Sequence, residues 1–273
     1  MRIARGPVLL AIIGCVLEVG CFLPDLKTTA ANGQDPAIAA AAIAAAAAQA
    51  DAIAHAPCVE ITFNGDVTFD GTASSYNGAC TIAGSVTVTE GVTDVELNQL
   101  QKIKEINGNL TLTMGKRAAE LPFPELTAVT GIIRVDQCVG LTKLSFPAIK
   151  ADCGGLVVNG NTVLGQVDFA GKGQLGFVRI TANGQMTWFD APELSVITQD
   201  LHVFDDPALH TLIFNSLKSV TSLDIELTAL TGLTGIAAGV SIGTWRICNN
   251  PKIPASVVTD FGQSHPTGKI ACP

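Results

Sequence analysis

The chain has 273 residues, of which only 5% are aromatic and 15% are charged, and its formal net charge is −8. This length allows one large domain or two small ones. Lys and Arg do not cluster along the chain, and phosphate binding needs a basic surface, so the charge argues against nucleic acid as a partner. Abundant glycine with a core of Leu, Val and Ile predicts a β-rich, repetitive fold.

The first 20 residues have the features of an export signal. Arg2 and Arg5 precede the apolar run "PVLLAIIG". This run is shorter than the ~20 apolar residues that a membrane-spanning helix needs. A small residue precedes a cysteine at Cys15 and at Cys21, as in the lipid-attachment motif of bacterial lipoproteins. Cleavage before Cys21 leaves six cysteines besides Cys21 itself, an even number that suits an oxidising compartment, so Cys21 is the predicted lipidation site and Cys15 the alternative.

Residues 21–56 are rich in alanine and offer almost no large apolar side chains for docking. We interpret this segment as a tether or linker. The folded domain is expected over residues 57–273. We therefore expect an exported protein, lipid-anchored in the outer membrane or at the cell surface, with a secreted or periplasmic soluble form as the alternative.

An internal repeat fills most of this domain. Short apolar–x–apolar pairs recur every 22 to 24 residues, and such a period is typical of solenoids. The first residues of these pairs are Val86, Leu110, Ile133, Leu156, Val178, Leu201, Leu223 and Trp245. The second residues are Val88, Leu112, Val135, Val158, Ile180, Val203, Ile225 and Ile247. The predicted fold is all-β: a right-handed parallel β-helix of about eight coils.

A second column of the repeat, five residues after each start, holds small or amide residues suited to a tight corner. Its members are Gly91, Gly115, Cys138, Asn161, Asn183, Asp206, Thr228 and Asn250. The return half of each coil is also apolar and often contains proline, as in "LPFPELTAV" at 121–129, so we expect a second strand or an extended turn there.

The segments "INGNLTL" (106–112), "LPFPELTAVTGIIRV" (121–135), "LSFPAI" (144–149) and "WRICNNPKIP" (245–254) give the chain a family resemblance. It resembles the receptor L domain, a leucine-rich-repeat-like β-solenoid of growth-factor receptors, fungal cell-wall proteins and bacterial envelope proteins. The resemblance covers about residues 81–261. It implies an architecture rather than an activity, because the matching positions are core and corner residues.

The cysteines predict closed ends for the solenoid. Cys58 and Cys80 bracket the first coil within an N-terminal cap at 57–80, and we predict a disulfide between them. The coils occupy 81–247, and a C-terminal cap follows at 248–273. Cys248 and Cys272 are predicted to pair there around a short helix at 254–262. Pairing of Cys138 with Cys153 stays open, because the two occupy different positions of the repeat.

Two motifs suggest chemistry only weakly. "GKGQLG" (171–176) has the glycine spacing of a dinucleotide-binding loop, but a strand pattern follows it instead of a helix, so no cofactor is predicted. "HVFDDPALH" (202–210) contains metal-ligand residue types, but Asp206 is in the corner column and the aspartates are typical of turns, so no metal is predicted.

The predicted function is binding or structure without catalysis. If the chain binds a protein or glycan at the cell surface, the outer face of the main sheet is the expected site. The residues expected on that face are Arg134, Asp136, Arg179, His202, Phe204, Asp224, Glu226 and Arg246. Asp224 and Glu226 beside Arg246 keep a polysaccharide lyase or hydrolase open as the alternative, although a cross-strand ion pair is the simpler interpretation. A structural spacer with no ligand is the third possibility.

Overall fold

The computed structural model describes Ala44 and residues 57–272, except 73–75, 117–118, 151 and 237–238. The chain divides into two compact units, Met1–Ala56 and Pro57–Pro273. The predicted signal, the lipidation cysteines Cys15 and Cys21, and nearly all of the tether lie outside the described residues.

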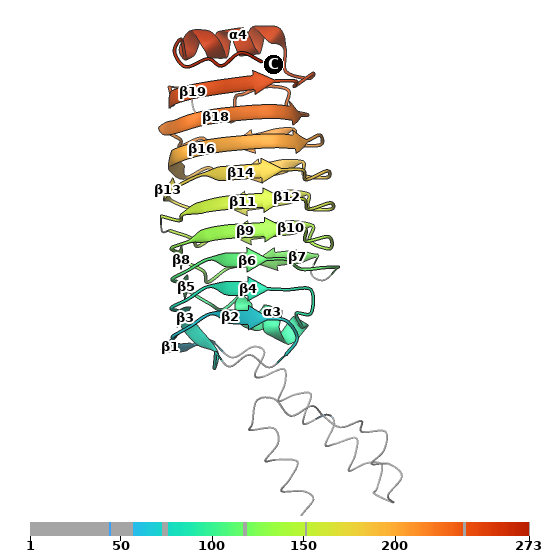
Figure 1. Ribbon diagram of the computed structural model, residues 1–273, viewed down its shortest axis with the longest axis vertical. Coiled ribbons are helices and arrows are strands. Elements are labelled where there is room, and N and C mark those ends of the chain that lie inside the picture. Colours follow the sequence, from blue (N-terminus) through green and yellow to red (C-terminus); the bar gives the residue numbers. More distant parts are fainter. Residues whose placement is uncertain are drawn as a thin grey trace, which may run out of the picture. The chain divides into compact units, whose positions relative to one another are not determined.

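The second unit is a parallel β-solenoid, as predicted (Figure 1). We call its three strand sets the main, return and side sheets. The main sheet contains β2 (Val67–Phe69), β4 (Val86–Val88), β6 (Leu110–Leu112), β9 (Ile132–Asp136), β11 (Gly155–Asn159), β14 (Val178–Thr181), β16 (Leu194–Asp206), β18 (Ser219–Thr228) and β19 (Ser241–Cys248). The return sheet contains β7 (Glu120–Pro122), β10 (Lys143–Phe146), β12 (Gln166–Phe169), β15 (Trp188–Asp190) and β17 (Thr211–Ile213). The side sheet contains β1 (Val59–Phe63), β3 (Ala79–Ile82), β5 (Glu105–Ile106) and β8 (Ala128–Val129), and the short strand β13 (Gly173–Leu175) pairs with β16.

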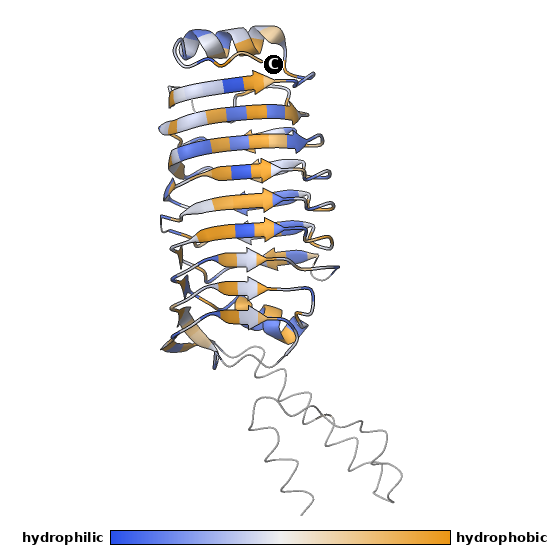
Figure 2. Ribbon diagram, viewed as in Figure 1, coloured by the Kyte–Doolittle hydropathy of each residue, from blue (hydrophilic) through white to orange (hydrophobic). Residues whose placement is uncertain are grey.

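The apolar pairs of the repeat form the core. Leu110 pairs with Ile133, Ile133 with Leu156 and Leu156 with Val178, and the same register continues to Trp245. These side chains are buried, and on the main-sheet strands other than β11, where Val157 lies between them, they alternate with polar residues (Figure 2). Strand residues alternate between the two faces of a sheet, so one residue of every two points into the solenoid. The predicted spine of stacked apolar pairs is confirmed.

The corner column is also confirmed, with one correction. Asn161 and Asn183 are fully buried, and Asn161 Nδ2 donates to Asn183 Oδ1 (2.9 Å) and to the Val135 carbonyl (3.0 Å). The corner residues therefore form a hydrogen-bonded ladder between coils. The left-handed backbone conformation, however, belongs to the residue before the corner residue, on six of the eight coils. It occurs at Gln137, Gly160, Ala182, Asp205, Leu227 and Asn249, with φ between 52° and 66°.

One return segment is helical, which the sequence analysis did not anticipate. Helix α3 (Asp94–Leu100) lies between β4 and β5. Thr93 and Glu96 form a capping box, in which Glu96 N–H donates to Thr93 Oγ1 (3.2 Å) and Thr93 N–H donates to Glu96 Oε2 (2.7 Å). Glu96 Oε2 also accepts from the Gly71 N–H (3.0 Å), so the helix is tied to the coil below it.

Both predicted disulfides are present, Cys58–Cys80 and Cys248–Cys272. The predicted C-terminal helix is α4 (Ala255–Ser264), which lies across the β19 end of the main sheet (Figure 1).

Cys138 and Cys153 do not form a disulfide; both are buried thiols. Cys138 follows β9 at the corner, whereas Cys153 precedes β11 and forms a bridge with Leu175, so the two lie at different positions of the coil. Burial raises the pKa of each thiol to about 11.

Candidate functional site

The eight predicted face residues lie on β9, β14, β16, β18 and β19 of the main sheet, with β11 between β9 and β14. Thr111 pairs with Arg134, Arg134 with Val157 and Val157 with Arg179. The same row continues through His202, Asp224 and Arg246. A parallel row contains Asp136, Asn159, Thr181, Phe204, Glu226 and Cys248. We call these two rows together the main-sheet face.

Near α4 this face has a connected cluster of charges. Arg246 donates twice to Asp224, from Nε to Oδ1 (2.9 Å) and from Nη2 to Oδ2 (2.6 Å). The same Nη2 lies 3.3 Å from Glu226 Oε2, and Asn249 Nδ2 donates to Glu226 Oε1 (2.8 Å). Hydrogen bonding to Asp224 raises the pKa of Arg246, so the guanidinium stays charged.

His202 and Phe204 lie one coil below this cluster. His202 Nδ1 is 3.4 Å from Asp224 Oδ2, and the His202 and Phe204 rings stack with centroids 6.0 Å apart. Phe204 is 37% exposed. An exposed aromatic ring beside fixed charges is a common feature of protein-binding surfaces.

The lower part of the face contains two further charged groups. Arg179 makes a bidentate ion pair with Asp200 (Nε–Oδ2 2.8 Å, Nη2–Oδ1 2.9 Å) and its guanidinium lies 4.4 Å from the centre of the Phe177 ring. Arg134 Nη1 is 3.2 Å from Asp136 Oδ2, and Asp136 Oδ1 accepts from Asn159 Nδ2 (2.9 Å). Most of the charges on this face are thus held in place before any partner binds.

Sequence reasoning missed three contributors to this region, Asp200, Phe177 and Asn249, because they lie outside the two rows. It also missed the outer face of the return sheet. There Lys143, Gln166, Asp168, Trp188 and Asp190 lie on three neighbouring strands. The alternation of "QVDF" and "TWFD" is the signal that could have revealed them, because every second residue of a strand points outward.

The residues of "HVFDDPALH" do not converge on one point. His202 is on the main-sheet face, Asp206 is buried in the corner ladder, and the His210 ring bonds Thr211 Oγ1 (2.9 Å). The glycines of "GKGQLG" border the short strand β13, and the next element is strand β14 rather than a helix. A dinucleotide fingerprint requires a helix at that place.

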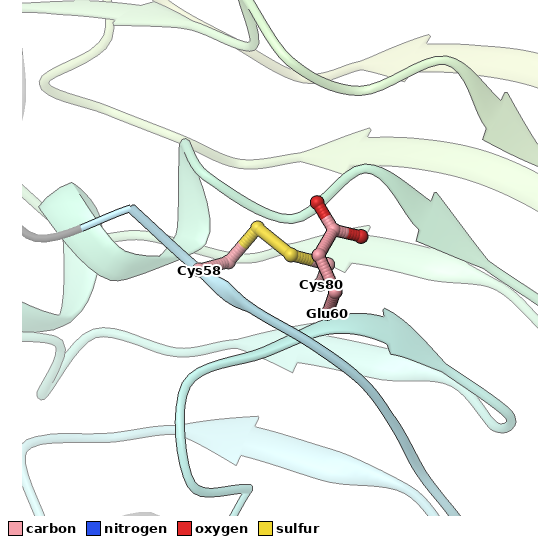
Figure 3. Close-up of side chains that lie close together, drawn as sticks. All are labelled: Cys58, Glu60 and Cys80. Atoms are coloured by element: carbon pink, nitrogen blue, oxygen red, sulfur yellow. A yellow bond between two sulfur atoms is a disulfide. The ribbon is translucent and has the colours of Figure 1, made fainter.

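One group of side chains in the described part of the chain has the spacing of metal ligands. Its members are Cys58, Glu60 and Cys80, whose ligand atoms lie within 4.8 Å of one another (Figure 3). The two sulfur atoms are joined in a disulfide, and Glu60 is ion-paired with Lys104. Metal binding requires thiolates, so in the oxidised protein this group is part of the cap.

Comparison with known proteins found no matching family model, no matching curated protein and no matching solved structure. The resemblance to the receptor L domain therefore stays a prediction. Within the described residues, no helix has the length and hydropathy needed to span a membrane.

Proposed function

We propose that the chain is an exported, lipid-anchored binding protein of the cell envelope, without catalytic activity, that presents its main-sheet face to a protein or glycan partner. The observation that supports this proposal is the alignment of Arg179, His202, Asp224 and Arg246 in one register row, with Phe204 exposed beside them. A solenoid sheet offers such residues on a flat, extended surface, which suits a large partner.

A protein is the favoured partner. The face carries both signs of charge, and complementary charges give orientation and specificity when two proteins associate. Bidentate pairs such as Arg179–Asp200 and Arg246–Asp224 already fix their side chains, so less conformational entropy is lost on binding.

The contacts of the acidic pair favour binding over hydrolysis. Arg246 holds both oxygens of Asp224, and Asn249 and Arg246 hold those of Glu226. A general acid or base must be able to exchange a proton with substrate. A carbohydrate-active enzyme stays the alternative, and release of soluble products from a polysaccharide, rather than simple retention, would identify it.

The proposed location rests on the N-terminal sequence and on two disulfides, which form in oxidising compartments. Metabolic labelling with a palmitate analogue tests it. Label should be lost in Cys21→Ser and kept in Cys15→Ser; the reverse result assigns the lipid to Cys15, and an unlabelled wild-type chain contradicts the anchor.

The main-sheet face is tested by placing a photo-crosslinking amino acid at position 204 of the full chain in its native envelope. We expect a defined adduct, reduced about tenfold when Arg179→Glu and Asp224→Lys are combined. A crosslinker at Val163, which is exposed at the corner after β11, is the matched control and should give no such adduct. An adduct that survives both charge reversals refutes the proposal.

A further inference from the structure

The return sheet stops at β17, which follows β16, whereas the main sheet continues through β18 and β19. Among the described residues, the next return segment pairs with the chain directly after β17 through an isolated bridge between Phe214 and Ile236. At Gly235 the two backbones are in close contact, since a Cβ there would lie 1.7 Å from the Leu212 carbonyl oxygen. At Gly232 a Cβ would meet nothing within 4 Å. The segment is thus tight against β17 at one point and open at another.

A hollow of about 550 Å³ lies between β17, the return segment at 231–235 and α4. Its lining includes Thr211 and Ile213 of β17, Asn215, Thr231, Thr234, and Val257 of α4. None of the described residues that line it is charged. Its volume is in the range of small-molecule sites, and hydroxyl and amide groups can donate and accept hydrogen bonds.

Two side chains of β15 adjoin the hollow. Trp188 is the register partner of Thr211, and Asp190 is the partner of Ile213, so each is one strand spacing, about 4.8 Å, from the lining. Trp188 is 36% exposed, whereas the other tryptophan, Trp245, is buried. An indole in this position presents a flat apolar surface next to a polar cavity.

Asp190 has an oxygen without a partner. Its Oδ1 is buried and has no hydrogen bond among the described residues. Burial and the neighbouring Asp168 raise the pKa of Asp190, while the Trp188 side chain lowers it. Asp168 itself is held by Gln166 Nε2 (2.7 Å) and by Lys143 Nζ (3.5 Å). Asp190 therefore has a donor in the Trp188 side chain but keeps one carboxylate oxygen, Oδ1, without a donor among the described residues.

We infer that the hollow, with Trp188 and Asp190 beside it, is a binding site for an uncharged oligosaccharide. A pyranose ring has an apolar C–H face that packs on indole and a rim of hydroxyls that bond Thr, Asn and carboxylate groups. The uncharged lining and the two adjacent carboxylates disfavour an anionic ligand. This inference is independent of the proposed function, because it concerns the opposite sheet.

The test titrates the full chain with the tetrasaccharides of N-acetylglucosamine, glucose in α and β linkage, and mannose, with tetragalacturonate as the anionic comparison. Binding is followed by calorimetry and by the tryptophan emission, to which exposed Trp188 and buried Trp245 both contribute. We expect at least one uncharged tetrasaccharide to bind saturably and to shift the emission to the blue, and tetragalacturonate to bind at least about tenfold more weakly.

Matched variants locate the site. Gly232→Phe fills the hollow and Trp188→Ala removes the indole, and each should weaken binding by about tenfold or more. Gly184→Phe is the control for the first, because a Cβ at Gly184 also meets nothing within 4 Å. Phe204→Ala, on the main-sheet face, is the control for the second.

Four results would overturn the inference: no binding of any uncharged tetrasaccharide, stronger binding of tetragalacturonate, unchanged affinity in both Gly232→Phe and Trp188→Ala, or loss of affinity in Phe204→Ala. Circular dichroism melting identifies any variant that fails to fold. If Gly232→Phe does not fold, Trp188→Ala decides the outcome, because its side chain lies on the surface.

Discussion

Asp206 occupies a place in the corner ladder that an amide fills on three other coils. Asn161, Asn183 and Asn250 each donate from Nδ2 to the carbonyl of the second core residue one coil below, at 2.9 to 3.0 Å. Asp206 Oδ1 accepts from the N–H and Nδ2 of Asn183, but its Oδ2 has no partner among the described residues. In the equivalent asparagines the Nδ2 at this position donates to a carbonyl oxygen, so we expect Oδ2 of Asp206 to face one too. A carboxyl group can donate to that oxygen only when it is protonated.

The pH dependence of stability follows from this contact. Burial raises the pKa of Asp206 to about 7 from 3.8. The folded state therefore binds more protons than the unfolded state between these values, and the free energy of unfolding falls as pH rises from about 4 to 7. Asp206→Asn should remove this loss and stabilise the protein at pH 8 by on the order of 4 kcal/mol, with little effect near pH 4.

Urea denaturation at pH 4 and pH 8 measures this difference. Asp260→Asn, on the exposed surface of α4, should leave the pH dependence unchanged. Equal stability of the wild type and Asp206→Asn at pH 8 would show that the Asp206 carboxyl is not held neutral by burial.

The left-handed residues that precede corner residues predict opposite effects of two substitutions on stability. Gly160 (φ 66°) and Ala182 (φ 56°) are equivalent residues on neighbouring coils. A Cβ costs about 1 kcal/mol in this conformation, so Gly160→Ala should destabilise the protein and Ala182→Gly should stabilise it, each by up to about 1 kcal/mol. Ala83→Gly, at an exposed residue without a positive φ, should destabilise. Effects of the same sign at positions 160 and 182 would contradict this account; chemical denaturation provides the measurement.

At the scale of the elements, the C-terminal cap covers the open edge of β19. The Trp245 N–H donates to the Gly268 carbonyl and the Trp245 carbonyl accepts from Ile270, both at 2.8 Å. The indole is buried against Phe261 of α4, and its Nε1 donates to the His265 carbonyl (3.0 Å). Trp245→Ala should cost about 3–5 kcal/mol, because it leaves a large cavity.

The matched control for this cap is Trp188→Ala, which removes the same side chain from a partly exposed position and should cost no more than about 1 kcal/mol. Thermal and urea denaturation of the two variants give the comparison. A cost at position 245 that is no larger than at position 188 would show that α4 does not stabilise the end of the solenoid.

The main-sheet strands, the corner column and both caps could be predicted, whereas the side sheet could not. A solenoid repeats its register: each coil adds 22 to 24 residues, so residues in one column of the sequence repeat stack in space. The two rows of the main-sheet face follow directly. Helix α3 was missed although Thr93 and Glu96 form a capping-box pattern, because the return segments were treated as alike.

Other features had no sequence signal. The left-handed residues before the corners are of five types besides glycine, so residue type does not mark them. The hollow beside β17 depends on how the next return segment passes the sheet, and no local pattern determines that.

At the scale of the whole molecule, a solenoid is nearly one-dimensional, because each coil contacts only its neighbours. Its two ends differ. The C-terminal edge is covered by α4 and residues 268–270, whereas β1 is the edge strand of the side sheet and leaves Val59 and Ile61 about half exposed. Hydrogen exchange should therefore be fastest in β1 and slowest in the central strands β9, β11 and β14.

Removing one cap should loosen only the coils beside it. In the double variant Cys248→Ser/Cys272→Ser, loss of a cross-link spanning 24 residues should destabilise the cap by about 3 kcal/mol. Amide exchange should then accelerate in β18 and β19 and stay unchanged in β4 and β6, because stability in a repeat protein is the sum of local and nearest-neighbour contributions. Cys58→Ser/Cys80→Ser is the reciprocal control and should accelerate exchange at the other end. Uniform acceleration along all coils in both variants would mean that the solenoid unfolds as one cooperative unit. The prediction that each cap stabilises only its own end would then be wrong.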